Sequence, residues 1–327
     1  MTPSAKENQA ASQRVAVVIP CYRVASSIGQ VLAQIGPEVQ RIYCVDDACP
    51  ENSGKRVQAQ IPDPRLEVLF HPTNLGVGGA TITGVKRALI EGADIIVKID
   101  GDGQMDPRLI GRFLRPILAG RADFTKGNRF FRLESLKPMP WVRLLGNAAL
   151  SFLTKLSSGY WYVMDPTNGF FAIHRAACGE LPLDKLSPRY FFESDLLFRL
   201  NTVGAVVEDV PMDANYTALS SNLRIRQAVV PFLFRNLANT AKRVFYSYFL
   251  RNFSLASLEL LAGAVLLLFG IVFGTVRWWH SVASGIPVTP GTVMLAALPT
   301  LLGVQMMLSF LGHDIRNTPQ IPLQKRL

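Results

Sequence analysis

Charge is the property that this sequence most lacks. Only 18% of its 327 residues are charged and 49% are hydrophobic, a balance that excludes an ordinary soluble enzyme. The excess lies in two 22-residue runs, Leu255–Val276 with one charged residue, Glu259, and Gly291–Gly312 with none. A helix of that length measures about 33 Å, close to the roughly 30 Å of a bilayer core. We interpret both runs as membrane-spanning helices rather than as buried helices of a soluble bundle.

Acidic residues are absent between Ala214 and Leu258. The basic residues of this stretch, together with apolar residues at helical spacing, predict amphipathic helices on an anionic membrane face, with a break or kink at Pro231. A net charge of +10 is also typical of nucleic-acid binding, but the adjacent spans favour lipid. We therefore expect membrane lipids, and no nucleic acid, as partners. The basic residues are Arg224, Arg226, Arg235, Lys242, Arg243 and Arg251, and the apolar ones are Phe234, Leu237, Ala241, Phe245 and Tyr248.

The first 14 residues lack the apolar core of a signal peptide, so we expect a disordered lead followed by a cytosolic domain. Two spans would return the chain to the cytosol and leave Arg277–Pro290 outside, with Trp278 and Trp279 as interface anchors. Basic residues before the first span and after the second agree with that topology. We therefore predict a multi-pass membrane protein with its globular domain in the cytosol.

Closely spaced cysteine pairs are lacking as well. The four cysteines form no C-x-x-C motif, which fits reduced cytosolic thiols better than disulfides or a zinc site. They are Cys21, Cys44, Cys49 and Cys178.

Short apolar runs alternate with helical stretches in the first hundred residues. This alternation predicts a mainly parallel, doubly wound α/β sheet. A further strand is expected at Asp123–Lys126. The earlier strands are expected at Val15–Ile19, Ile42–Val45, Leu66–Phe70 and Ile95–Ile99, and the helices between them at Ser27–Ile35, Ser53–Gln60 and Val77–Ile90.

The fourth strand is followed by two aspartates one residue apart, in the run IIVKIDGDGQMDP. Open α/β sheets bind ligands at the carboxyl ends of their strands, and residues i and i+2 of an extended segment point the same way. Asp100 and Asp102 can therefore share a site in which hard oxygen ligands suit Mg²⁺ or Mn²⁺ holding a diphosphate. Asp106 and Pro107 then open a helix. A D-x-D turn alone is common by chance, but these features and Gln104 together favour a metal site.

A glycine-rich turn, His71–Ala80, follows the third strand. It lacks the G-x-G-x-x-G spacing of a dinucleotide site, and it follows the third strand instead of the first. We interpret its glycines as permitting tight turning and close packing of a helix on the sheet.

A series of motifs runs in a fixed order through the first two hundred residues. They are Ile19-Pro20-Cys21-Tyr22, Val45-Asp46-Asp47, Asn74-Leu75-Gly76-Val77-Gly78, Asp100-Gly101-Asp102-Gly103-Gln104, Gly127-Asn128-Arg129-Phe130, Asp165-Pro166-Thr167-Asn168-Gly169-Phe170-Phe171 and Phe191-Phe192-Glu193-Ser194. Together they resemble the family-2 inverting glycosyltransferases, in particular the branch that glycosylates polyprenyl phosphates, which includes dolichol-phosphate mannose synthases and bactoprenol glucosyltransferases. The resemblance covers roughly Val15–Tyr216. It implies a GT-A-like fold and a single displacement with inversion at the sugar's anomeric carbon.

The resemblance also implies roles on the donor side. Asp102 and Gln104 would coordinate the divalent ion, Asp100 would lie near the ribose and diphosphate, and Arg224 would reach the donor diphosphate. The sequence departs from the family's usual P-x-Y-N-E and D-D-G-S motifs, at Arg23-Val24 and Ala48-Cys49, so the base of the donor, UDP or GDP, stays open. The pocket for base and ribose would be lined by Pro20, Tyr22, Asp46 and Asp47.

On the acceptor side, the resemblance implies that Arg129 and Arg143 grip the acceptor phosphate. Arg143 lies on an apparent helix with many leucines, where a membrane-facing basic residue is an equally good interpretation. A lipid phosphate is largely dianionic at neutral pH and needs little help from a base. Asp165 and Glu193, the other candidate catalytic residues, are thus open to three roles: proton transfer, orienting substrate, or holding neighbouring arginines.

Two other functions fit parts of the pattern. A processive polysaccharide synthase of the same superfamily would carry a Q-x-x-R-W signature, but Gly274 stands where its glutamine should precede Arg277-Trp278. A silent nucleotide-binding membrane scaffold would not need the intact site residues. We therefore predict sugar transfer from a UDP- or GDP-sugar to a polyprenyl phosphate, undecaprenyl phosphate in a bacterium, and related enzymes suggest a homo-oligomer. The expected divisions are a disordered lead at 1–14, a catalytic domain at 15–220, interface helices at 221–252, a transmembrane hairpin at 253–312 and a cytosolic tail at 313–327.

Overall fold

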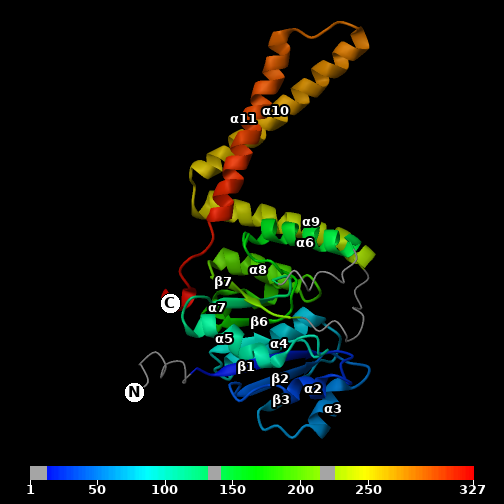
Figure 1. Ribbon diagram of the computed structural model, residues 1–327, viewed down its shortest axis with the longest axis vertical. Helices are drawn as coiled ribbons and strands as arrows, with labels where there is room; N and C mark the ends of the chain where they lie inside the picture. Colours follow the sequence, from blue (N-terminus) through cyan, green and yellow to red (C-terminus); the bar gives the residue numbers. More distant parts are fainter. Residues whose placement is uncertain (1–12, 132–140, 214–224) are drawn as a thin grey trace. The chain divides into compact units, whose positions relative to one another are not determined.

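The computed structural model describes residues 13–131, 141–213 and 225–327 (Figure 1). Nearly all of the expected disordered lead, residues 1–12, lies outside this range. The chain forms two compact units. The first comprises the residues up to Thr240 together with Pro319–Leu327, and the second comprises Ala241–Thr318. The chain therefore leaves the first unit once and returns to it.

A seven-stranded sheet forms the centre of the first unit, in the order β3-β2-β1-β4-β6-β5-β7. Neighbouring strands pair in parallel except around β6, which is antiparallel to both β4 and β5. The mainly parallel sheet is thus confirmed. The carboxyl ends of the other strands meet the start of β6 at one edge. The strands are β1 (Val15–Cys21), β2 (Arg41–Asp46), β3 (Leu66–Phe70), β4 (Ile95–Lys98), β5 (Phe124–Asn128), β6 (Phe171–His174) and β7 (Val207–Pro211).

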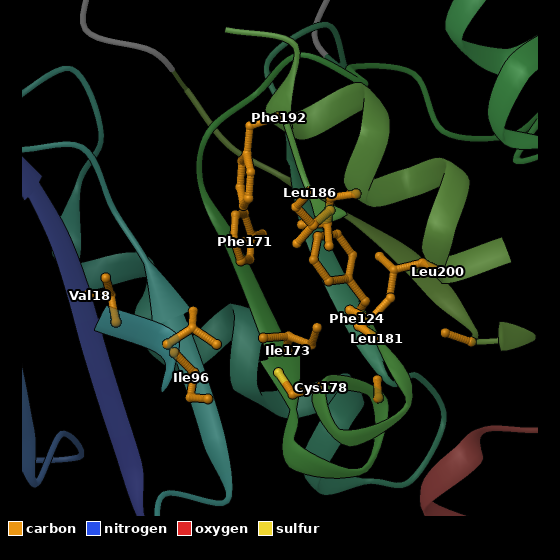
Figure 2. Packing of buried hydrophobic residues seen from close by; sticks show 14 of the residues in the cluster. Val18, Ile96, Phe124, Phe171, Ile173, Cys178, Leu181, Leu186, Phe192 and Leu200 are labelled. Atoms are coloured by element: carbon orange, nitrogen blue, oxygen red, sulfur yellow. The ribbon is translucent and has the colours of Figure 1, made fainter. Parts of the chain in front are cut away.

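Helices cover both faces of this sheet. Alternate strand residues point to opposite faces, so β1 sends Val17 into one core and Val18 into the other. Helices α2, α3 and α5 contribute to the first core and α4, α7 and α8 to the second. Figure 2 shows the second core, where Phe124 and Phe171 stack with ring centroids 5.1 Å apart. The helices are α2 (Ile28–Ala33), α3 (Ser53–Gln60), α4 (Val77–Ile90), α5 (Ile110–Leu118), α6 (Trp141–Ser158), α7 (Arg175–Glu180) and α8 (Phe192–Val203).

The capped helix expected after the two aspartates is present. The Asp106 carboxylate accepts a hydrogen bond from the Arg108 backbone N–H at 3.0 Å, and Pro107 begins a short 3₁₀ turn that leads into α5. Proline suits this first position because its missing N–H would have no partner in the helix.

The last residues of the chain belong to the first unit. Leu323 is buried in the core that includes Phe124, and the backbone N–H groups of Leu323 and Gln324 donate to the Asp123 carboxylate at 2.8 and 3.1 Å. The Gln324 side chain donates to two backbone carbonyls of the same unit. A buried carboxylate needs such donors, so the segment from Pro319 onward is part of this fold and not a separate tail from residue 313.

The second unit contains the two apolar runs. They form α10 (Leu255–Ser284) and α11 (Pro290–Arg316), each long and apolar enough to cross a membrane by length and composition. The loop expected at Arg277–Pro290 is much shorter, because α10 continues past Trp278 and Trp279 to Ser284. It ends at Gly285, whose φ of +69° suits a helix terminus, and no helix-breaking residue precedes that glycine after Arg277.

A charged cluster joins the start of this unit to its end. Helix α9 (Ile225–Phe245) places Arg243 against Asp314 of α11 in a bidentate pair, with Nη1···Oδ1 2.7 Å and Nη2···Oδ2 2.9 Å. The Tyr248 hydroxyl, from a π-helical turn, donates to the same carboxylate at 2.7 Å. At Pro231, where we expected a break or kink, α9 continues without a break, because the missing N–H removes only one of its hydrogen bonds.

Candidate active site

Asp100 and Asp102 lie at the carboxyl end of β4 in a turn, not in the extended segment expected from the sequence. The Ser27 hydroxyl, at the start of α2, donates to the Gly101 carbonyl at 2.7 Å and anchors the turn. The Gln104 N–H donates to Asp102 Oδ1 at 3.0 Å. Burial and the charge of Asp100 raise the pKa of Asp102. The turn therefore still places the two carboxylates at one site.

Lys98, the last residue of β4, contacts this acidic cluster through its side-chain amine. Its side chain is fully buried, and its Nζ lies 2.7 Å from Asp100 Oδ1 and 3.8 Å from Glu193 Oε1. Burial disfavours its charge, but the Asp100 and Glu193 carboxylates outweigh burial and raise the pKa of Lys98. This residue was not among those predicted from the sequence, although a lysine at the end of an otherwise apolar strand is a usable signal.

Lys126 of β5 lies on the other side of β6, where Phe171 pairs in register with both lysines. Its Nζ donates to the Asn168 carbonyl at 2.5 Å, and burial lowers the pKa of Lys126 to about 8. Burial also raises the pKa of Glu193, at the start of α8. The charges of Lys98 and Lys126 both act on this carboxylate in the opposite direction. Sequence analysis missed Lys126 too.

Gly169, from the D-P-T-N-G-F-F motif, makes room for the Lys98–Asp100 pair. A Cβ atom at this position would lie 2.5 Å from Lys98 Nζ and 2.6 Å from Asp100 Oδ2. Any other residue here would therefore displace the pair.

Asp165 is fully buried and holds Arg129. The Arg129 side chain binds it in a bidentate pair, with Nε···Oδ2 2.6 Å and Nη2···Oδ1 3.0 Å. The Arg129 backbone N–H and the Asn168 side chain donate to Oδ2 as well, at 3.2 and 3.3 Å. Four donors occupy the capacity of a carboxylate, so this geometry fits a role in holding the arginine and gives no support to proton transfer.

Asp46 and Asp47, expected to line the donor pocket, accept hydrogen bonds from the backbone of neighbouring loops. Asp46 accepts from the backbone N–H groups of Cys49 at 2.8 Å and Gly54 at 2.6 Å. Asp47 accepts from those of Leu75 at 2.8 Å and Gly76 at 2.7 Å, and it contacts His71 Nδ1 at 2.8 Å. The glycine-rich turn is thus fixed by Asp47. Gly76, with φ +91°, allows the Pro188 carbonyl to approach the turn.

The remaining expected donor residues lie at the end of β1. Pro20 pairs with Val45 of β2, and Tyr22 is 42% exposed beneath the Arg23 guanidinium, 5.5 Å from its ring centroid. Arg224 lies outside the described residues, and Arg143 lies in the first turn of α6 with its side chain outside them. Their expected roles remain predictions.

The cluster has the chemistry of a shared metal site. Among the described residues, no group of three or more His, Cys, Asp or Glu side chains converges closely enough to hold an ion alone. Mg²⁺ is commonly bound by one or two carboxylates, water and substrate phosphates. Burial and, after it, the neighbouring Asp100 charge raise the pKa of Asp102, and a bound cation would favour its ionised form. Asp102, with Asp100 and Gln104 beside it, therefore fits an ion shared with a diphosphate.

Known structures share this fold. The glucosyl-3-phosphoglycerate synthase of Mycobacterium tuberculosis, in complex with Mn²⁺, UDP and phosphoglyceric acid, aligns with a TM-score of 0.55 at 19% identity, covering 73% of this chain and 81% of that one. A second structure of that enzyme, with Mg²⁺ and UDP, aligns with a TM-score of 0.51 at 21% identity, covering 73% of this chain and 82% of that one. The architecture described above is therefore GT-A-like.

Sequence relatives carry more specific names. UDP-N-acetylglucosamine–dolichyl-phosphate N-acetylglucosaminyltransferase of Methanococcus voltae is 30% identical over 224 residues, 64% of this chain and 89% of that one. Undecaprenyl-phosphate mannosyltransferase of Micrococcus luteus is 29% identical over 203 residues, 61% of this chain and 82% of that one. Residues 16–181, which include the β4 turn and Arg129, match the model of glycosyl transferase family 2. This chain therefore belongs to glycosyl transferase family 2.

Proposed function

We propose that this glycosyltransferase moves a sugar from a nucleotide-sugar donor to a polyprenyl phosphate at the bacterial inner membrane, with inversion at the anomeric carbon. The observation that carries the proposal is the cluster at the carboxyl edge of the sheet, Asp100 and Asp102 beside Lys98 and Glu193, in a chain that also has two apolar helices of membrane-spanning length. The names of the relatives support the acceptor class.

On the donor side, Asp102 and Gln104 would hold a divalent cation, Mg²⁺ or Mn²⁺, against the donor's diphosphate. When bound, the cation supplies Lewis-acid stabilisation of the charge that develops on the leaving diphosphate. Lys98 holds the Asp100 carboxylate in place and offsets its charge, which reduces repulsion of the incoming donor. Tyr22 offers an exposed aromatic ring for the base.

On the acceptor side, Asp165 orients the Arg129 guanidinium at the end of β5, where it would bind the lipid phosphate. A phosphate dianion is itself a competent nucleophile at neutral pH, so the site's task is to align it with the anomeric carbon. Glu193 faces the same cluster and would help to set the position of Lys98. Arg143 and Arg224 are proposed as additional phosphate ligands.

The return of the chain to its first unit supports a cytosolic location of both hairpin ends. The residues up to Thr240 and those from Pro319 onward form one compact unit, so a hairpin that crosses the membrane must begin and end on the same side. With the catalytic unit in the cytosol, only the turn around Gly285 would face outward.

Cysteine labelling tests this topology. The four native cysteines are buried, so an engineered thiol gives a clear signal. We expect Ser284→Cys to react with an impermeant reagent applied from outside, and Leu327→Cys, at a side chain that is 77% exposed, to react only after the membrane is opened. Labelling of Leu327→Cys from outside would reverse the topology.

The reaction is tested by incubating the protein in nanodiscs with undecaprenyl phosphate and a panel of UDP- and GDP-sugars. We expect one donor to give a lipid product heavier by one sugar, detected by mass spectrometry. The proposal would be contradicted if a sugar nucleotide were hydrolysed without formation of a glycolipid, or if no donor reacted.

A further inference from the structure

Three consecutive residues at the start of α8 contact three different parts of the first unit. Glu193 Oε1 lies 3.8 Å from Lys98 in the active site. Ser194 Oγ lies 3.4 Å from the Thr154 hydroxyl of α6, and Asp195 Oδ1 accepts from the Asn239 side chain of α9 at 3.2 Å. Successive helix residues point about 100° apart, so one turn can reach all three neighbours. The turn that carries Glu193 is therefore fixed from outside the active site.

Helix α9 also holds the segment just before this turn. The Phe232 ring packs edge-to-face on Phe191 with centroids 5.3 Å apart, and the Arg235 guanidinium lies 5.6 Å from the centroid of the same ring. Arg235 donates to the Ser187 hydroxyl at 3.2 Å. Phe232, Arg235 and Asn239 are spaced by three and four residues, so they share one face of α9.

The opposite face of α9 is apolar and exposed. Val230, Phe234 and Leu237 repeat at helical spacing on that face, and the Phe234 side chain is 66% exposed. The proposed function places this helix at the membrane, where such a face is buried in the interfacial region of the bilayer. One helix thus joins the lipid surface to the turn that carries Glu193.

We propose that α9 is a positioning element for the active site, and that Asn239 is its principal positioning residue. Asn239 holds Asp195 Oδ1, while Ser187 N–H and Arg199 hold Oδ2, so Asn239 is the contact by which α9 sets the direction in which Glu193 leaves the first turn of α8. Glu193 then stands opposite the Lys98–Asp100 pair and completes the charge balance around the buried Lys98 amine. This inference rests on the proposed function, because Glu193 is assigned to the transfer site there.

Asn236 provides a matched control on the same helix. It is buried like Asn239, but its side-chain oxygen accepts from Ser157 of α6 at 2.6 Å, so its inter-helix contact is to α6 and not to α8. Leucine is close to asparagine in size and removes the amide in both variants. We expect Asn239→Leu and Asn236→Leu to lower the melting temperature by similar amounts, and Asn239→Leu alone to lower kcat by about tenfold or more.

A double-mutant cycle separates positioning from general loosening of the fold. If Asn239 acts through Glu193, adding Asn239→Leu to Glu193→Gln lowers kcat by less than about twofold further, because the group that it positions has already been changed. Equal losses of kcat in the two leucine variants, or losses of kcat that multiply in the double variant, would overturn the inference. The proposed function would stand in that case, provided that the wild-type protein transfers sugar. Failure of the wild-type protein to transfer any sugar to undecaprenyl phosphate would overturn both.

Discussion

Two pairs of aspartates follow parallel strands at the same edge of the sheet, and the structure uses them differently. Asp46 and Asp47 follow β2 and accept mainly from backbone N–H groups of the loops that they support. Asp100 and Asp102 follow β4 and contact the buried Lys98 amine and the Gln104 backbone N–H, and burial raises the pKa of the Asp102 carboxyl group. The first pair therefore stabilises the fold, and the second holds negative charge that is only partly compensated.

The two pairs of aspartates therefore differ in how far their charge is compensated. A carboxylate surrounded by backbone donors gains from ionisation and rigidifies its loop. A carboxylate pair with few donors destabilises the fold. Such pairs are typical of sites where a bound ligand compensates the charge. The two pairs look alike in sequence, so substitutions are needed to test the distinction.

The largest effect is expected for Asp102→Asn. We expect turnover to fall by about a thousandfold, because the proposed ligand of the divalent ion is lost. The melting temperature should stay the same or rise, because the raised pKa of Asp102 shows that burial of its charge is unfavourable. Product formation and thermal melting measure the two quantities, and a chelator should stop the wild-type protein equally. Asp106→Asn, at the cap of the helix before α5, is the control. Near-normal transfer by Asp102→Asn would remove it from the site.

A loss of stability is expected for Asp47→Ala. This change leaves the Leu75 and Gly76 N–H groups without their acceptor and removes the contact with His71, so we expect the free energy of unfolding to fall by about 3–5 kcal/mol. Turnover per folded molecule should fall far less than in Asp102→Asn. Denaturant unfolding and activity corrected for the folded fraction measure both. Wild-type stability with lost activity would instead group Asp47 with the second pair.

The electrostatic side of the comparison can be sharpened at Lys126, where burial lowers the pKa to about 8. Between pH 10.5 and about 8, the unfolded lysine is protonated and the folded one is largely neutral, so the stability from this site is present at high pH and declines as the pH falls through that window. At about 1.4 kcal/mol per pKa unit, the change is about 3 kcal/mol at most. Thermal melting across this range should show the wild-type protein losing stability relative to Lys126→Met as the pH falls, if the lowered pKa of Lys126 is right. Parallel curves would show that Lys126 keeps an ordinary pKa.

Local patterns in the sequence were sufficient for much of the fold. Apolar runs located β1 to β4 within one or two residues, and Asp106-Pro107 located the start of the next helix. The reversed direction of β6 was not predictable, because strand direction depends on pairing between distant segments. The length of the outer turn was overestimated, since charge and tryptophans at Arg277–Trp279 indicate the membrane interface but do not end a helix.

The candidate site divides in the same way. The D-x-D turn and the Arg129 motif are visible as residue patterns, and the structure brings the aspartates to one edge of the sheet. The contacts that hold these side chains are long-range. Asp165 binds Arg129, 36 residues away in the sequence, and Lys98 of β4 lies near Glu193 of α8. No local pattern encodes such contacts, so Lys98 and Lys126 could be noticed as buried lysines but not assigned partners.

The docking of Leu323 and Gln324 on Asp123 has a consequence for how the protein is made. Asp123 and Leu323 are separated by 200 residues, and both long apolar helices, α10 and α11, are encoded between them. At roughly 5–20 residues per second, a ribosome needs roughly 10–40 s to supply the missing donors. During that time the Asp123 carboxylate lacks two of its hydrogen bonds, and the core lacks the Leu323 side chain. The first unit can therefore complete its fold only after α10 and α11 have been synthesised, so the two apolar helices leave the ribosome before that unit is finished.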